Sequence, residues 1–169
     1  MKQKTVNFSY TIYEKSDELP EITQQLLTAA REACDLAHAP YSQFRVGAAV
    51  LLQNGTILKG ANQENAAYPM CTCAEQVALY HSAMQFPGEK IDALAIHVNV
   101  KNSVSHPPSP CGACRQVILE YEQKLHQDIN IYISSLTKEV YHFESIKALL
   151  PFYFSGDDLG VREDCLIIN

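Results

Sequence analysis

Cys73-Ala-Glu75 and Pro110-Cys-Gly-Ala-Cys114 are the two segments around which the rest of the chain is arranged. Together they supply three thiols and one carboxylate. Three cysteines without a fourth protein ligand are typical of a zinc site with one open coordination position, which a catalytic site requires. Cys111 and Cys114 lie on one face if a helix begins there. Glu75 converges on Cys73 only in the first turn of a second helix, and both segments run into helical patterns.

These residues resemble the zinc signature of the cytidine deaminases, small nucleoside enzymes with three cysteine ligands and a glutamate that does not bind the metal. Other segments resemble segments of the same family and occur in the same order, from the first predicted helix to Leu159: Pro40-Tyr-Ser-Gln-Phe-Arg-Val-Gly47, Gly60-Ala-Asn-Gln-Glu-Asn-Ala-Ala-Tyr-Pro69 and Leu149-Leu-Pro-Phe-Tyr-Phe-Ser-Gly-Asp-Asp-Leu159. The resemblance implies one Zn²⁺ per chain, held by Cys73, Cys111 and Cys114.

Composition limits the classes of function. The 169 residues are 47% hydrophobic, which suits one globular domain over 1–169. The net charge of −6 and the lack of a basic run argue against nucleic-acid binding and favour a small neutral substrate. No apolar segment has membrane-spanning length, and residues 1–19 do not resemble a signal peptide. The six cysteines, three of them in metal-binding spacing, therefore predict a cytoplasmic metalloprotein rather than a disulfide framework.

The hydrophobic pattern alternates between strands and helices, which predicts an α/β fold. We expect a three-layer α/β/α sandwich with a mixed central sheet, as in the cytidine deaminases. Residues 1–18 form an N-terminal extension with a strand that adds an edge to the sheet or contacts another subunit, and 160–169 form a C-terminal extension. Strands are predicted over 4–13, 46–52, 56–59, 91–100, 129–134 and 140–143, and helices over 20–37, 73–84, 112–124 and 144–150.

The expected chemistry is hydrolysis of the amidine C–N bond of cytidine or 2′-deoxycytidine, which gives uridine or 2′-deoxyuridine and ammonia. Removal of the amine from C4 needs a strong nucleophile, and a metal-activated water supplies one at neutral pH. Glu75 is expected to take the proton from this water, pass it to N3 and then protonate the leaving amine. The alternative for Glu75 is an acidic residue that only interacts with the helix dipole.

The cysteines also have other readings. Cys111 and Cys114 match a redox CxxC pair, but such a pair needs neither Cys73 nor Glu75. A closed structural zinc site needs a fourth ligand, for which Cys71 is the candidate. The Cys71–Cys73 spacing is tighter than the usual C-x2-4-C pair, and the family has no ligand at that position. Cys34 and His97 lie in apolar patterns and are expected in the core.

The resemblance also implies a substrate site. Asn62 and Glu64 match ribose-binding positions of the family, and Phe44 matches the aromatic residue that packs against the base. Tyr68 and Phe154 match aromatic residues that reach the active site of a neighbouring subunit, so a homo-oligomer is expected, with a tetramer favoured over a dimer. The alternatives are ordinary loop polarity for Asn62 and Glu64 and a core position for Phe44.

One residue departs from the family pattern. The residue after Cys-Ala-Glu is commonly Arg, and here it is Gln76. Since three thiolates on Zn²⁺ leave a negative site, Arg115 and the two helix N-termini are expected to offset more of that charge.

Several functions remain open. The first is a cytidine deaminase of pyrimidine salvage. The second is a deaminase of another small amine, such as a blasticidin-type nucleoside or a free base, and the third is an inactive, zinc-stabilised binding module. Editing of nucleic acids is disfavoured by the acidic charge.

Overall fold

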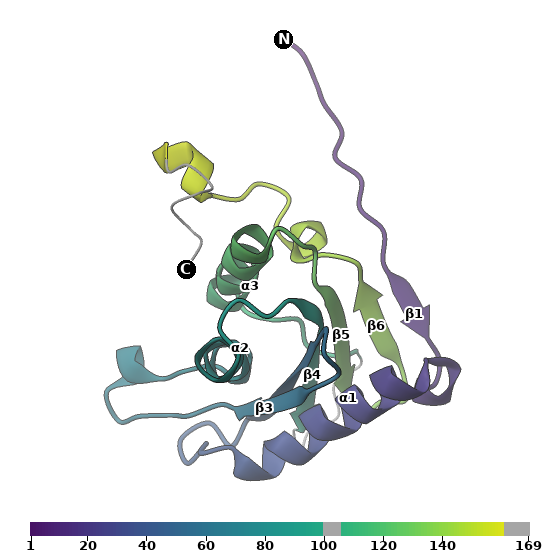
Figure 1. The fold of residues 1–169 in the computed structure, drawn as a ribbon, viewed down its shortest axis with the longest axis vertical. Helices are drawn as coiled ribbons and strands as arrows, with labels where there is room; N and C mark the ends of the chain where they lie inside the picture. Colours follow the sequence, from purple (N-terminus) through teal and green to yellow (C-terminus); the bar gives the residue numbers. More distant parts are fainter. Residues whose placement is uncertain (100–105, 161–169) are drawn as a thin grey trace.

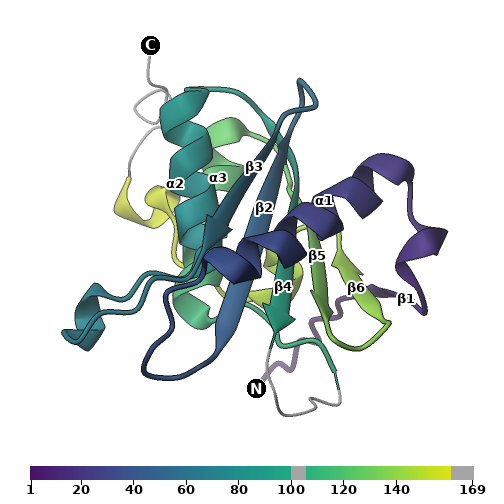
Figure 2. The same ribbon diagram turned by 90° about the horizontal axis from the view of Figure 1, so that it is seen from below.

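The computed structural model describes residues 1–99 and 106–160, in which a six-stranded sheet lies between helices on both faces. Helix α1 covers one face, and α2 and α3 lie side by side on the other (Figures 1 and 2). The strands are β1 (Thr11–Tyr13), β2 (Arg45–Leu52), β3 (Ile57–Ala61), β4 (Ile91–Asn99), β5 (Asn130–Ser135) and β6 (Val140–Phe143). The helices are α1 (Glu21–Ala33), α2 (Ala74–Gln85) and α3 (Gly112–Leu125). The predicted three-layer sandwich is confirmed.

The sheet is mixed, in the order β1-β6-β5-β4-β2-β3. Only β4 and β5 are parallel, because α3 carries the chain back across the sheet between them. The antiparallel hairpin of β2 and β3 turns at Asn54 and Gly55, where the Asn54 side chain accepts a hydrogen bond from the Thr56 N–H and Gly55 has a φ of 85°. This φ favours glycine, and Asn-Gly is a common sequence at such a turn.

The two faces of the sheet have different cores. In β4, Leu94 and Ile96 pack toward α2 and α3, whereas Ala93 and Ala95 face α1. Both pairs are buried, so this central strand is covered on both sides, as its continuous apolar sequence predicted.

Two glycines allow the helices to lie close to the sheet. A Cβ on Gly47 of β2 would lie 2.0 Å from the Ala30 carbonyl oxygen of α1. A Cβ on Gly60 of β3 would lie 2.3 Å from the Ala78 backbone nitrogen of α2. Both distances are too short for any side chain, so these positions fix the packing of α1 and α2.

Short 3-10 helices complete the described chain: Ser16–Glu18, Cys34–Leu36, Tyr68–Met70, Ile146–Leu149 and Gly156–Leu159. Two of them correct the sequence predictions. The helix predicted over 20–37 ends as an α-helix at Ala33 and continues as a 3-10 turn, in which Leu36 is 66% exposed. The helix predicted over 144–150 is the 3-10 turn Ile146–Leu149.

The strand predicted over 4–13 is wrong for most of its length. Only Thr11–Tyr13 pairs with β6, and the preceding residues extend away from the domain (Figure 1). The other predicted helices and strands agree with the structure to within two residues at most ends.

Cys34 and His97 are buried, as predicted. His97 Nδ1 lies 2.9 Å from the Ser134 hydroxyl, and burial lowers the pKa of its imidazole to about 4. Among the described residues, no helix combines the length and apolar character needed to cross a membrane. The last residue of the strand predicted over 91–100 and nearly all of the C-terminal extension lie outside the described residues.

Candidate active site

The first turns of α2 and α3 bring the three predicted metal ligands together. Cys73 and Cys111 are the N-cap residues of the two helices, each with extended backbone angles. The Cys73 carbonyl accepts a hydrogen bond from the Val77 N–H, and the Cys111 carbonyl accepts one from the Arg115 N–H. Cys114 follows in the first turn of α3 and is fully buried. Both helices therefore direct their positive N-terminal ends toward the sulfurs.

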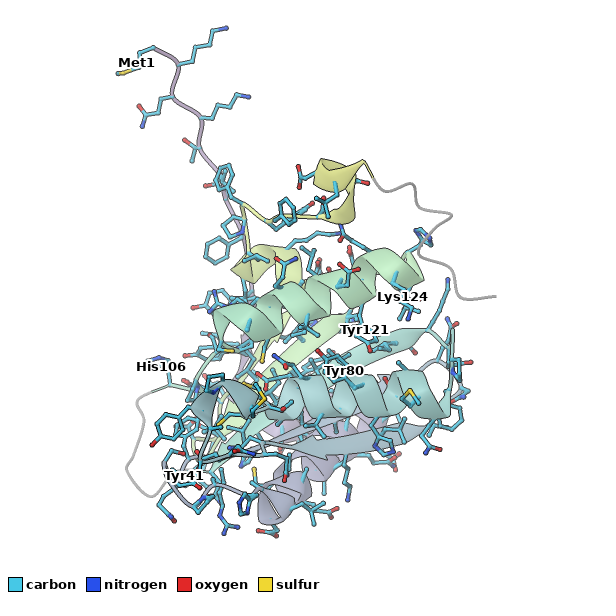
Figure 3. The ribbon with its side chains drawn as sticks, turned by 90° about the vertical axis from the view of Figure 1, so that its left-hand side faces the viewer. Met1, Tyr41, Tyr80, His106, Tyr121 and Lys124 are labelled. Carbon is cyan, nitrogen blue, oxygen red and sulfur yellow. The ribbon has the colours of Figure 1, made fainter. Side chains whose placement is uncertain are left out.

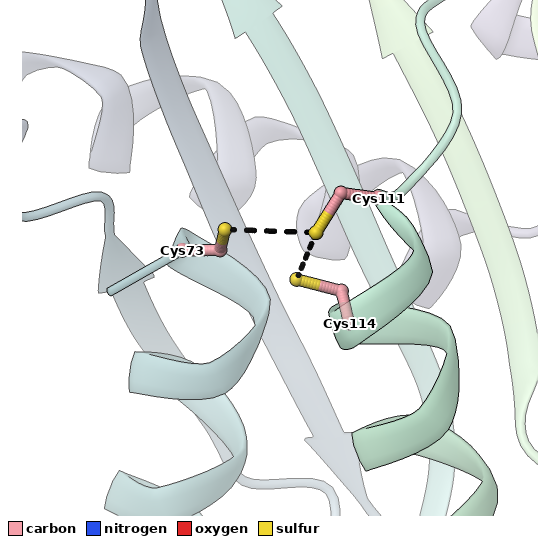
Figure 4. A group of neighbouring side chains, drawn as sticks. All are labelled: Cys73, Cys111 and Cys114. Carbon is pink, nitrogen blue, oxygen red and sulfur yellow. Dashed lines mark hydrogen bonds between the residues drawn. The ribbon is translucent and has the colours of Figure 1, made fainter. Parts of the chain in front are cut away.

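The sulfur atoms form a compact cluster (Figure 4). The Cys73 and Cys111 sulfurs lie 3.9 Å apart, and those of Cys111 and Cys114 lie 3.4 Å apart. All three lie within 4.8 Å of one another. Tetrahedral zinc with Zn–S bonds of about 2.3 Å requires sulfur separations of about 3.8 Å. The cluster fits one zinc ion per chain.

The environment also favours thiolate formation at Cys73. Hydrogen bonding to the Cys114 thiol lowers the pKa of Cys73 to about 7. The same interaction raises the pKa of Cys114. Because the thiolate is the form that binds metal, the lowered pKa of Cys73 favours metal binding at this residue.

Cys71 does not belong to the cluster. Its sulfur lies 3.3 Å from the Asn65 backbone nitrogen, in the loop before α2. Among the described residues, the cluster therefore contains three protein ligands, the number expected for a site with an open coordination position.

Glu75 lies beside the sulfurs in the first turn of α2. Its side chain is only 4% exposed, and burial raises the pKa of its carboxyl group. It also lines a cavity of about 580 Å³ whose wall includes Cys73 and Cys111. A carboxyl group with a raised pKa keeps its proton to a higher pH than an exposed glutamate does, which favours a role as a proton shuttle.

Three predicted substrate residues line the same cavity. Phe44 precedes β2, and Asn62 and Glu64 follow β3. The Asn62 amide oxygen accepts a hydrogen bond from the Val46 N–H, and its amide nitrogen donates one to the Phe44 carbonyl, each at 2.9 Å. Asn62 thus holds the start of β2, and its amide keeps one donor and one acceptor position for a ligand.

Glu64 is held by the loop before β2. Its carboxylate accepts hydrogen bonds from the Tyr41 N–H at 2.9 Å, the Ser42 N–H at 3.3 Å and the Ser42 hydroxyl. The Ser42 hydroxyl lowers the pKa of Glu64, so the side chain is an anion with a fixed orientation.

Tyr68 and Phe154 do not line this cavity. They are 69% and 58% exposed, and Tyr68 contacts only the edge of the Tyr41 ring among the aromatic side chains described, with ring centroids 5.9 Å apart. The Phe154 carbonyl accepts a hydrogen bond from Gln116 of α3 at 2.8 Å. Within one chain the structure does not bring these two residues to the site.

Gln76, which replaces the usual arginine, and Arg115, which was expected to offset the thiolate charge, make different contacts. The Gln76 amide nitrogen lies 3.8 Å from the Cys114 sulfur and donates to it. Arg115 donates to the carbonyl oxygens of Pro110 and Leu149, at 2.9 and 2.8 Å. Arg115 therefore holds the backbone before Cys111, and its hydrogen bonds go to these carbonyls and not to the sulfurs.

Some cavity residues were not predicted from the sequence. Ile96 and Val98 of β4 supply apolar wall, as do Pro108 and Pro110 of the loop before α3. Ser42 was part of a quoted motif, but its bond to Glu64 was not foreseen. These contacts depend on the strand order, since β4 becomes the neighbour of β2 only in the folded sheet.

Comparisons with known proteins agree with this site. Residues 20–126 match the family model described as the cytidine and deoxycytidylate deaminase zinc-binding region. Cytidine deaminase of Halalkalibacterium halodurans is 35% identical over 81% of this chain and 97% of its own length. Cytidine deaminase of Sporosarcina psychrophila is 38% identical over 81% of this chain and 94% of its own.

A solved structure is also similar. The crystal structure of cytidine deaminase from Burkholderia pseudomallei superimposes with a TM-score of 0.67 and is 36% identical, covering 77% of this chain and 97% of its own. The family match over residues 20–126 includes all three cysteines of the cluster. The chain belongs to the cytidine deaminase family of zinc-dependent hydrolases.

Proposed function

We propose that this protein removes the amine from cytidine and 2′-deoxycytidine by hydrolysis, releasing ammonia and uridine or 2′-deoxyuridine. The observation that carries the proposal is the position of Glu75. It is a buried carboxyl group next to a zinc-fitting cluster of three thiols, on the wall of a cavity of about 580 Å³. That volume suits a nucleoside-sized ligand.

The metal ligands and the proton shuttle have separate tasks. Cys73, Cys111 and Cys114 would hold the zinc ion, which when bound supplies a water activated for attack at neutral pH. Glu75 receives the proton of that water and transfers it to N3 as the hydroxyl group adds to C4. It then carries the second proton to the amine, the C4–N bond breaks, and ammonia leaves.

The remaining cavity residues would bind and orient the nucleoside. Glu64 and Asn62 face the position of the sugar in this proposal, where the carboxylate accepts from a ribose hydroxyl and the amide uses its free donor or acceptor. Phe44, 38% exposed beside the cavity, packs against the base. Apolar contacts from β4 exclude water from the other side of the ring.

The assembly and cellular role belong to the same proposal. Residues 1–169 act as one domain in a homo-oligomer, a tetramer in preference to a dimer, in which the exposed Tyr68 and Phe154 reach a neighbouring subunit's site. All five described cysteines are free thiols, which suits a reducing cytoplasm. There the reaction would serve pyrimidine salvage.

The test is the loss of cytidine absorbance on addition of the zinc-loaded protein, measured beside Glu75→Ala. Loss of a proton shuttle lowers turnover by about 100-fold or more. Glu89→Ala, a change at a half-buried glutamate that does not line the cavity, serves as the matched control. Metal analysis must give one zinc per chain for all three proteins.

Two outcomes would contradict the proposal. Absence of turnover of both nucleosides by zinc-loaded wild-type protein would favour another aminated substrate or a binding module. Full activity of Glu75→Ala would remove the assigned proton shuttle.

A further inference from the structure

Residues 5–12 carry the sequence pattern of a half-buried strand. The even positions Val6, Phe8, Tyr10 and Ile12 are apolar, whereas the odd positions Thr5, Asn7, Ser9 and Thr11 are polar. Successive side chains of a strand point to opposite faces, so this segment has one apolar face and one polar face. Such alternation is typical of a strand paired on an edge and covered on its apolar side.

The domain of the same chain covers little of the apolar face of this segment. Pairing with β6 begins at Thr11, and the preceding arm, residues 1–10, projects from the domain with Met1 far from its body (Figures 1 and 3). Tyr10 is the last anchored side chain, with its ring stacked 5.2 Å from that of Phe143. Beyond it, Val6 is 54% exposed and Phe8 is 58% exposed.

The arm is also an addition to the family's domain. The family match begins at residue 20, so the catalytic core does not include the arm. Strand β1 is the last strand on its side of the sheet, and its outer edge has no partner strand among the described residues. Folded proteins seldom leave a long apolar strand unpaired at an edge, because it invites another strand.

The charges at the two ends of the arm indicate which kind of strand pairs with it. Lys2 and Lys4 lie at the outer end of the arm, whereas its inner end is followed by residues 14–18, which carry three acidic side chains and one lysine and are therefore acidic overall. When two such segments run antiparallel, the basic end of each lies beside the acidic end of the other. A contact of this kind is self-complementary, as a two-fold symmetric dimer requires.

We propose that residues 4–12 of two copies of this chain pair as antiparallel strands. The two sheets are thereby joined through their β1 edges. The apolar faces of both arms, with Phe8 near the centre, form one shared surface. The arms contribute to assembly and take no part in the chemistry, so deamination can be measured as a separate property of the same variants.

The test compares two single substitutions in the full-length, zinc-loaded protein. Phe8→Asp places a charge on the apolar face, and Asn7→Asp places the same charge on the polar face one residue away. Sedimentation velocity over a range of concentrations gives the mass, and amide hydrogen exchange gives the protection of residues 4–12. Because the arm makes few contacts with its own domain, neither change threatens the fold.

The wild type and Asn7→Asp are expected to show protected arm amides and the same mass. Phe8→Asp is expected to lose that protection and to associate at least tenfold more weakly. Three results would overturn the proposal: unprotected arm amides in an oligomeric wild type, protected amides in a protein that sediments as a single chain, or no effect of Phe8→Asp on either measurement.

Discussion

At the scale of single residues, the site depends on two cysteines, each of which is the N-cap residue of its own helix. Cys73 and Cys111 each precede a helix and accept its first backbone hydrogen bond through their carbonyl groups. Their sulfurs therefore lie where two helix N-termini stabilise negative charge. Glu75 and Cys114 follow in the first turns, two and three residues later. The site is a consequence of where these two helices begin.

Substitution of Gln76 tests how the negative charge of the three thiolates is balanced. Its amide donates to the Cys114 sulfur at 3.8 Å but brings no charge. Three thiolates with Zn²⁺ carry a net charge of −1, which reduces the ability of the metal to activate water. We therefore expect Gln76→Arg to raise turnover. The expected effect is about tenfold, which is the usual size for substitutions at residues that contact metal ligands. Gln123→Arg is the control, because Gln123 lies in the last turn of α3, at the opposite end from the cysteines.

Turnover alone does not separate this effect from a change in metal content. The zinc dissociation constant of each variant, measured by competition with a chelator, supplies the second readout. If Gln76→Arg leaves both turnover and the zinc dissociation constant at wild-type values, the electrostatic role of position 76 is wrong.

The residue scale also shows what sequence reasoning can reach. The three cysteines and Glu75 were predicted because their spacing along the chain is itself the signal. Ser42 and Ile96 gave no such signal, since a hydroxyl in a loop and an isoleucine in a strand are common everywhere. Their places beside Glu64 and in the cavity wall depend on how distant strands meet.

At the scale of elements, the separation between helix and sheet is set by glycine. Gly47 lets α1 lie against β2, where a Cβ would meet the Ala30 carbonyl oxygen at 2.0 Å. Gly47→Ala must therefore displace backbone, which does not yield as a side chain does. We expect a loss of about 1–3 kcal/mol in the free energy of unfolding, measured with urea.

Gly112→Ala is the matched control for that experiment. In the described part of the chain, no atom outside the surrounding turn of α3 lies within 4 Å of the Cβ that this change would add, and Gly112 is not in the left-handed region of backbone angles. Equal stability of Gly47→Ala and the wild type would show that α1 is not held at this distance by the glycine.

The elements that were predicted well are those with a strong local signal. Strand β6 has the predicted bounds, and α2 and α3 begin within a residue of the predicted positions. The arm was predicted as a strand because its alternation is as regular as that of a paired one. Alternation reports two different faces of a segment but does not say which chain covers them, so the pairing partner could not be read from it.

At the scale of the whole molecule, the zinc cluster joins two helices that are distant in the sequence. Cys73 and Cys111 are separated by 38 positions, and their helices lie side by side on one face of the sheet (Figure 2). A metal bound to both holds α2 and α3 together at their N-termini. Zinc should therefore stabilise the fold as well as support the reaction.

Removal of zinc with a chelator is expected to lower the melting temperature by about 10 °C. A ligand present at about 1,000 times its dissociation constant stabilises the folded state by about 4 kcal/mol. For a domain of this size, that free energy corresponds to a change of about 10 °C in melting temperature. Differential scanning calorimetry with and without chelator measures it. Cys71→Ser and Cys73→Ser form the matched pair, since they are two residues apart and only Cys73 lies in the cluster.

Cys71→Ser should retain one zinc per chain and the full response to chelator, because its sulfur contacts the Asn65 backbone and not the other thiols. Cys73→Ser should melt at the lower temperature from the start and respond little to chelator, since two thiols hold zinc far less tightly than three. Loss of zinc from Cys71→Ser would instead make Cys71 a ligand and close the open position that deamination needs. The calorimetric comparison thus tests the ligand set, the stabilising role of the metal and the open coordination position together, without depending on turnover.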